Sequence, residues 1–147
     1  MLQGDGVDLE KSVGYALKET ASALRLAMEN ALRPLGMTVT HYACLELLGQ
    51  RPGMSNSELA RGAFVTRQSM NVLLQSLERD GSVTRPASAT EGRVLPAQLT
   101  PQGKRALATA SAAVREVELG MLGDLTEDER TLLLSLLQRM TTSLRDR

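Results

Sequence analysis

The segment from Met54 to Thr100 constrains the fold of this 147-residue chain more than any other part of the sequence. Ser55 and Glu58 have the Ser-x-x-Glu spacing of a capping box, which predicts a short helix. Thr66 is placed to cap a second helix, and Gly81 is placed to end it. Two short capped helices joined by a tight turn form a helix-turn-helix. Apolar residues of the second helix recur at the spacing of one helical face: Met70, Leu73, Leu74 and Leu77.

Beyond the second helix the pattern changes to that of a β-hairpin. Residues 82–85 predict one strand, residues 94–99 predict another, and the small polar residues between them predict a long tip. Pro96 would lie inside the second strand, which therefore needs a free edge. A hairpin in this position is a wing, with Arg85 at the end of its first strand and Arg93 near its tip. An arginine on a protruding tip suits a narrow minor groove, where the negative potential is enhanced.

A long helical pattern precedes this segment. Apolar residues recur every three or four positions from Leu9 to Leu32, and Pro34 cannot continue the helix without cost. A helix of this length, about 36 Å at 1.5 Å per residue, is too long for a small domain to bury on its own. Thr38 or Thr40 is placed to cap the next helix, which should end near Gly49.

Two further long helices follow the hairpin. Thr100, with Pro101 after it, predicts the start of the first, and the Thr126 to Glu129 spacing predicts a capping box at the start of the second. These helices and the N-terminal one carry more apolar surface than a monomer of this size could cover. Large apolar patches mark partner surfaces, so we expect a homodimer.

The predicted fold class is mainly α with a small β-hairpin. We expect a single domain over residues 1–147, in which residues 38–100 form a winged helix-turn-helix DNA-binding region. Residues 8–34 and 101–146 should form the helical dimerisation region. The chain has two Tyr, one Phe and no Trp, so that Leu, Ala, Val and Met must fill the core. Such a core suits helices that pack on helices.

The formal net charge of zero conceals an uneven distribution. Arg51 to Arg105 contains eight basic and four acidic residues, a net charge of +4, and the remainder of the chain carries −4. A basic middle points to nucleic acid, although charges that only solvate a surface would give the same pattern. The N-terminus lacks an apolar signal core, and no apolar run approaches the roughly 18 residues that a membrane span needs. We therefore expect a cytoplasmic protein that does not bind membranes.

The helix that Thr66 caps has the composition of a helix that reads DNA. A recognition helix presents its N-terminal residues to the major groove, where Arg pairs with guanine and Gln or Asn with adenine. No acidic residue occurs in this helix before Glu78, as expected for a helix that faces phosphates. The predicted DNA-binding residues of the chain are Ser55, Thr66, Arg67, Gln68, Ser69, Asn71, Gln75, Arg85 and Arg93.

The order of these motifs resembles that of the MarR (multiple antibiotic resistance) family of winged helix-turn-helix transcriptional regulators. The resemblance extends from Leu9 to Arg145 and includes a Leu-Thr-x-x-Gly element after the wing and a Leu-Thr-x-x-Glu element at the start of the last helix. One departure lies at the wing tip, where relatives often have Asp-x-Arg and this chain has Glu91-Gly92-Arg93. From the longer acid and the glycine we expect Arg93 to keep its role but to be held less firmly than in those relatives. The segments that carry the resemblance are residues 35–38, 57–60, 65–81 and 93–103.

The resemblance implies a homodimer, formed by the first, fifth and sixth helices, that represses transcription from a pseudo-palindromic operator. A two-fold dimer places its recognition helices in successive major grooves of double-stranded DNA, about 34–36 Å apart. Such regulators often release DNA when a small aromatic acid or phenol binds between the dimer helices and the winged region. The positions of this chain that match the ligand site are Thr20, Ala23, His41 and Tyr42.

Two of the residues have alternative interpretations. His41 could bind a carboxylate as a charged donor if its pKa is near neutral, or it could simply occupy the third helical position beside a cap. Cys44 could sense oxidants, or it could be a buried, inert thiol. His41 and Cys44 could share a metal ion, but the chain has no other His or Cys to complete a soft-ligand site. No metal and no cofactor is therefore expected.

Two other classes of protein compete with a DNA-binding regulator. The chain has one His and lacks a phosphate-binding loop or a Ser-His-Asp set, so we do not expect an enzyme. A protein-interaction module that does not bind DNA is the remaining alternative.

Overall fold

Six α-helices and a two-stranded antiparallel sheet make up the computed structural model, which describes residues 6–86 and 96–147. Val83 pairs with Leu99 and Thr84 with Gln98 in the sheet. The expected mainly α fold with a small β-hairpin is confirmed. The elements are a short 3-10 helix (Leu9–Lys11), α1 (Val13–Leu32), a second 3-10 helix (Arg33–Leu35), α2 (Val39–Gln50), α3 (Asn56–Gly62), α4 (Arg67–Arg79), β1 (Val83–Thr84), β2 (Gln98–Leu99), α5 (Pro101–Leu122) and α6 (Glu127–Arg145).

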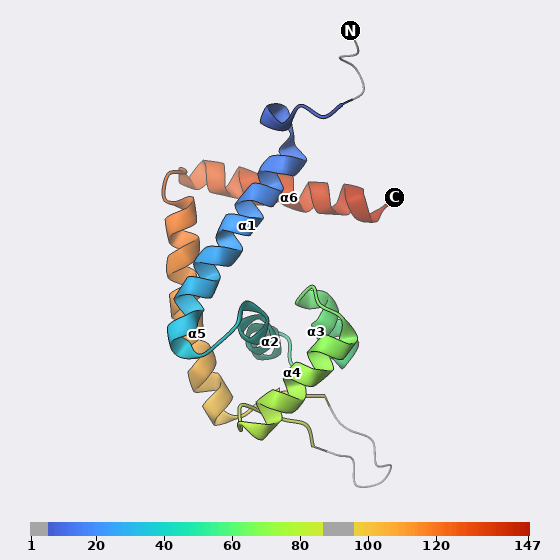
Figure 1. Ribbon diagram of the computed structural model, residues 1–147, viewed down its shortest axis with the longest axis vertical. Helices are drawn as coiled ribbons and strands as arrows, with labels where there is room; N and C mark the ends of the chain where they lie inside the picture. The colour runs from blue at the N-terminus through green and yellow to red at the C-terminus, as the bar shows by residue number, and fades with distance from the viewer. Residues whose placement is uncertain (1–5, 87–95) are drawn as a thin grey trace.

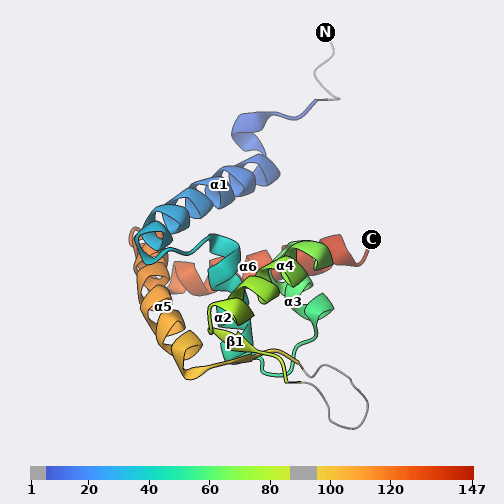
Figure 2. The ribbon, with the colours of Figure 1, turned by 60° about the horizontal axis from the view of Figure 1, so that its bottom comes forward.

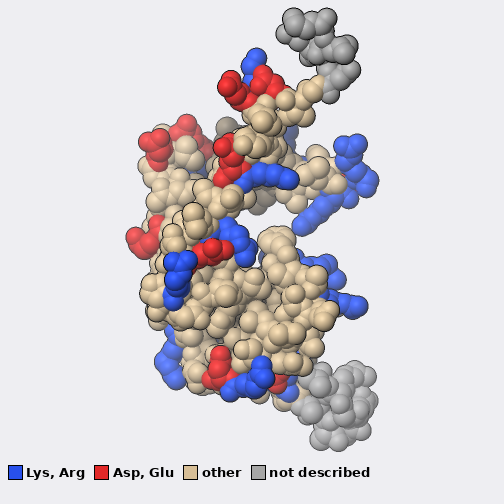
Figure 3. Space-filling view, viewed as in Figure 1, with Lys and Arg blue, Asp and Glu red and all other residues tan. Residues whose placement is uncertain are grey.

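The helices form two groups. α2, α3 and α4 gather with the strands in the lower half of Figure 1, and the long helices α1, α5 and α6 form the upper and left parts. α5 contacts both α1 and α2 and so joins the two groups, as the turned view in Figure 2 also shows. α6 extends from the far end of α5, and open space separates its C-terminal half from the lower group in Figure 3.

The main hydrophobic core lies between α2, α3, α4 and the sheet. Met70, Leu74 and Leu77 of α4 are fully buried there, and Leu73 is partly buried against them. The face predicted from their spacing is therefore the face that packs. The other buried members of this core are Cys44, Leu45, Leu48, Leu59, Ala60, Val83 and Ala97.

The predicted helix caps are present. Ser55 and Glu58 form a reciprocal capping box at α3, and Thr126 and Glu129 form another at α6. The Thr66 hydroxyl accepts a hydrogen bond from the backbone N–H of Ser69 at 3.0 Å. Thr38, rather than Thr40, caps α2. These local hydrogen bonds satisfy N–H groups that the first turn of a helix leaves free.

Hydrogen bonds from residues 100–103 connect the start of α5 to the turn that follows α4. The Thr100 hydroxyl donates to the carbonyl oxygen of Gly81 at 2.5 Å, and its backbone N–H donates to the carbonyl oxygen of Ser82 at 3.0 Å. Gln102 Nε2 donates to the carbonyl oxygen of Asp80 at 2.8 Å. Because Gly81 has φ 85°, the chain can leave α4 in a left-handed turn and present these carbonyl groups.

Two sequence predictions are wrong in detail. The N-terminal helix does not run unbroken from Leu9, since Ser12 has an extended backbone and caps α1, which begins at Val13. Pro96 lies outside β2, which begins at Gln98, because proline has no N–H to donate to a neighbouring strand. The predicted wing tip, Glu91-Gly92-Arg93, lies outside the described residues.

Candidate nucleic-acid interface

One exposed stripe runs along α4 on the side opposite the core. Residues four, seven and eleven positions apart lie on the same side of a helix, and the four positions of this stripe are all exposed. Two of the four residues were predicted to bind DNA. The other two were not, although the same helical spacing places them on this side of the helix. The stripe consists of the predicted Gln68 and Gln75 and of Val72 and Arg79.

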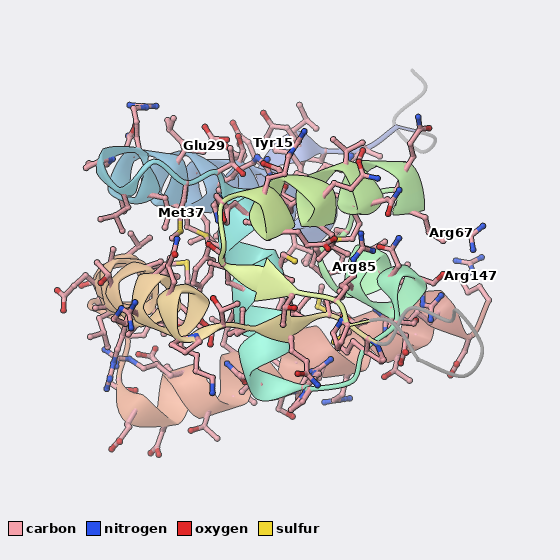
Figure 4. All side chains as sticks on the ribbon, turned by 90° about the horizontal axis from the view of Figure 1, so that it is seen from below. Tyr15, Glu29, Met37, Arg67, Arg85 and Arg147 are labelled. Carbon is pink, nitrogen blue, oxygen red and sulfur yellow. The ribbon has the colours of Figure 1, made fainter. Side chains whose placement is uncertain are left out.

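The N-terminal end of α4 carries the other predicted residues. The Arg67 guanidinium extends from this end at the edge of the molecule, where its Nη1 donates to Ser57 Oγ of α3 at 3.3 Å (Figure 4). Ser69 is exposed, and its hydroxyl accepts a hydrogen bond from the Thr66 hydroxyl at 2.9 Å. Asn71 is only partly exposed, because it lies nearer to the core than the stripe does.

Ser55 lies at the start of α3, and its hydroxyl belongs to the capping box. Its Oγ accepts a hydrogen bond from the backbone N–H of Glu58 at 3.1 Å, while Glu58 Oε1 accepts from the backbone N–H of Ser55 at 3.0 Å. The hydrogen bonds from Ser55 lower the pKa of Glu58. Ser55 as a whole residue remains exposed.

Arg85 follows β1, and its side chain lies against α4. Its Nε and Nη2 lie 2.7 and 2.6 Å from Glu78 Oε1, and only 19% of its side chain is exposed. Figure 4 shows Arg85 among the elements of the winged region, whereas Arg67 points outward. The pair joins the base of the wing to the last turn of α4 and neutralises the carboxylate of Glu78.

The four predicted ligand-site residues are not brought together in the single chain. Thr20 and Ala23 line a largely apolar groove of about 400 Å³ between α1 and α5. His41 and Tyr42 lie on α2 and do not line it. A shared ligand site would require a further wall or a movement of α2.

The Tyr42 hydroxyl is already engaged in a network with α5. It donates to Glu46 Oε2 at 2.7 Å, and the Ser111 hydroxyl donates to the same oxygen at 2.6 Å. Gln50 Nε2 donates to Glu46 Oε1 at 2.6 Å. Burial opposes ionisation of Glu46, but these three hydrogen bonds outweigh it and lower the pKa of the carboxyl. Burial and the bond to Glu46 raise the pKa of Tyr42 to about 12.

His41 occupies the capped first turn of α2. Its backbone N–H donates to Thr38 Oγ1 at 3.0 Å, which agrees with the interpretation of His41 as the partner of a cap. Burial lowers the pKa of the imidazole from its usual 6.5, and the negative charge of Asp80 offsets part of that effect. His41 is therefore mainly neutral at pH 7, which weakens it as a charged donor for a carboxylate.

Cys44 is completely buried in the main core. Burial raises the pKa of its thiol to about 12, and the thiolate is the form that reacts with oxidants. The structure therefore gives the redox-sensing alternative no support.

Within residues 6–86 and 96–147, no group of three or more His, Cys, Asp or Glu side chains is placed to hold a metal ion. None of the described helices is both long and apolar enough to cross a membrane.

The fold and the exposed stripe of α4 define a winged helix-turn-helix protein, and comparison with known proteins identifies its family. The sequence profile of the MarR family matches residues 35–94. The HTH-type transcriptional repressor Rv2887 of Mycobacterium tuberculosis is 42% identical over 125 residues, which cover 85% of this chain and 90% of the relative. This chain belongs to the MarR family, and the predicted family is confirmed.

Two crystal structures of Rv2887 are similar to this chain. The complex with salicylic acid has a TM-score of 0.75 and 40% sequence identity, and the match covers 92% of this chain and 98% of that chain. The complex with DNA has a TM-score of 0.73 and 38% identity over 88% of this chain and 97% of that chain. The similarity therefore includes the long helices as well as the winged region.

Proposed function

We propose that this protein is a homodimeric transcriptional repressor that binds a pseudo-palindromic site in double-stranded DNA. The observation that carries the proposal is the exposed face of α4, which has amide and guanidinium groups and no acidic residue before Glu78. Those groups are the ones that pair with base edges in the major groove. The DNA complex of the related repressor Rv2887 supports the same mode of action.

The predicted DNA-binding residues divide by their position. Arg67, Gln68, Asn71 and Gln75 lie on α4 and would contact bases. Ser55, Thr66 and Ser69 lie at the helix starts, where free N–H groups and hydroxyls suit phosphates. Arg93 would enter the minor groove. Arg85, held by Glu78, would orient the wing more than touch DNA.

Homodimerisation is proposed from the exposed apolar surface of the long helices. Leu132, Leu134 and Leu144 of α6 are 58%, 58% and 69% exposed. A groove of about 580 Å³ between α1, α5 and α6 is also lined mostly by apolar side chains, among them Leu17 and Leu136. A second copy would cover this surface and would hold two α4 helices at the spacing that a pseudo-palindrome requires. Residues 8–34 and 101–146 would then be the dimerisation helices and residues 38–100 the DNA-binding region.

The proposed effector is a small aromatic acid or phenol that releases the DNA. The salicylic acid complex of Rv2887 supports this class of ligand. The groove between α1 and α5, with Thr20 and Ala23, offers an apolar surface for an aromatic ring. Tyr42 and His41 would contribute only if the ligand reaches α2. The protein would act in the cytoplasm, without a membrane partner and without catalytic activity.

Binding to a random double-stranded DNA library tests this function. The full-length protein should select an inverted repeat whose half-sites lie one helical turn apart, and salicylate should reduce the binding. Arg93→Ala should weaken binding to all sequences, whereas Arg67→Ala and Gln68→Ala should relax the preference for particular bases. Failure to select any sequence at low salt would overturn the proposal. Identical behaviour of both kinds of variant would overturn the division between wing and helix.

A further inference from the structure

Val72 lies where a helix that reads DNA is expected to be polar. It is 57% exposed and occupies the middle of the outward stripe of α4, four residues after Gln68 and three before Gln75. The core of the winged region is formed by other residues of α4, so that Val72 does not stabilise that core. Its isopropyl group is therefore available for contact with a partner of this chain.

The surroundings of Val72 argue against a site for another protein. The neighbouring exposed positions of α4 are polar, among them Ser69 and Ser76 as well as the two glutamines of the stripe. Most of the exposed large apolar side chains lie instead on the long helices α1, α5 and α6, and the exposed Phe64 precedes the N-terminal end of α4. A single short apolar side chain between two amides suits a partner that is itself mainly polar and has isolated apolar groups.

The major groove of DNA is such a partner. Base edges there present hydrogen-bond donors and acceptors, and the one apolar group among them is the C5-methyl of thymine. A valine can neither donate nor accept a hydrogen bond, and so it gains most from a base edge that carries this methyl group. The flanking glutamine amides suit the N6 and N7 atoms of adenine. All three side chains thus favour A·T base pairs.

We propose that Val72 is a specificity-determining residue that recognises the C5-methyl group of a thymine in each half-site, while Gln68 and Gln75 contact the adjacent base pairs. The inference rests on the proposed binding of double-stranded DNA through α4. It adds a residue and a chemical group to that function: the helix distinguishes thymine from uracil and from cytosine by van der Waals contact.

Replacement of thymine by uracil tests the contact, because it removes only the methyl group. DNA selected by the wild-type protein from a random library is amplified once with dTTP and once with dUTP, and the affinity for each product is measured. Synthetic duplexes with one symmetric thymine-to-uracil change per half-site then locate the position. Burial of one methyl group corresponds to about a fourfold change in affinity, and two half-sites to about fifteenfold.

Comparison of two variants separates direct contact from altered DNA shape. Val72→Ala should lose the preference for thymine at the located position, whereas Gln75→Ala should bind more weakly and keep that preference. Because Val72 is exposed, Val72→Ala should unfold at the wild-type temperature, so that loss of binding by misfolding is detectable. A wild-type protein that binds thymine and uracil duplexes equally would overturn the inference, and so would a Val72→Ala variant with the wild-type preference. Failure to select any DNA would overturn the proposed function itself.

Discussion

The carbonyl oxygen of Ser82 occupies the space where Gly103 would carry a side chain. Gly103 lies in the first turn of α5, and its backbone N–H donates to Thr100 Oγ1 at 3.1 Å. The start of the long helix therefore packs directly on the strand end that follows α4. This contact explains physically why a Leu-Thr-x-x-Gly element follows the wing, since any Cβ would force the helix and the sheet apart.

Gly103→Ala should lower the free energy of unfolding by about 2 to 3 kcal/mol, because the added methyl group meets backbone that cannot rotate away. Chemical denaturation measures the change. Gly14→Ala in α1 is the control, since a Cβ at Gly14 would meet only Ser12 Oγ at 3.8 Å. This substitution should change the free energy of unfolding by less than about 1 kcal/mol. Equal effects of the two substitutions would contradict the packing at Gly103.

Arg85 and Glu78 should be energetically coupled. Their side chains are 19% and 34% exposed, so water screens the ion pair only in part. A double-mutant cycle with Arg85→Ala and Glu78→Ala should give a coupling of about 1 kcal/mol in the free energy of unfolding. Strictly additive effects would show that the two side chains do not interact in solution.

Phe64 should be replaceable by glycine with a gain in stability. It has φ 60°, a left-handed conformation that costs a non-glycine residue about 1–2 kcal/mol, and its side chain is 86% exposed. Phe64→Gly should therefore raise the free energy of unfolding by about 1 kcal/mol. Phe64→Ala keeps the Cβ and serves as the control, which should gain little. A loss of stability in the glycine variant would mean that the Phe64 ring makes contacts in solution.

His41 is the single histidine of the chain, so its titration can be followed by NMR without ambiguity. The midpoint should lie below 6.5, because burial disfavours the imidazolium, and Asp80→Asn should lower it further. Below pH 6.5 the unfolded chain binds the proton more tightly than the folded chain does, so that stability declines as pH falls toward the folded pKa. His41→Gln should reduce this decline. A midpoint above 6.5 would show that the imidazole is not desolvated.

Cys44 should not react with thiol reagents in the native protein. With a pKa of about 12, its thiolate is scarce at pH 8, and its side chain is fully buried. The native protein should therefore react with a disulfide reagent only as fast as it unfolds, whereas the protein in guanidinium should react at once. Hydrogen peroxide should leave DNA binding unchanged. Rapid labelling of the native protein would restore the redox-sensing alternative.

Much of the interface was predictable because it depends on short-range spacing. The capping boxes and the buried face of α4 arise from hydrogen bonds and contacts between residues three or four positions apart, which any reader of the sequence can count. The same spacing indicates Val72 and Arg79 in the outward stripe. The composition rule for base contacts does not indicate them, because valine has no hydrogen-bonding group and Arg79 lies at the C-terminal end of the helix.

Tertiary structure alone decided the features that join distant segments. It placed Arg85 against Glu78, whereas the sequence indicated only that Arg85 ends the first strand. It also placed Glu46 beside Ser111, 65 positions later. The Tyr42 hydroxyl and the Ser111 hydroxyl both donate to Glu46, so that the Tyr42 hydroxyl is not free for a ligand. The sequence by itself determined the order of the helices, most of their starts and the polar character of the outward face of α4, because these follow from local periodicity. Which side chains meet across the core follows from how whole helices pack, and no local spacing encodes that.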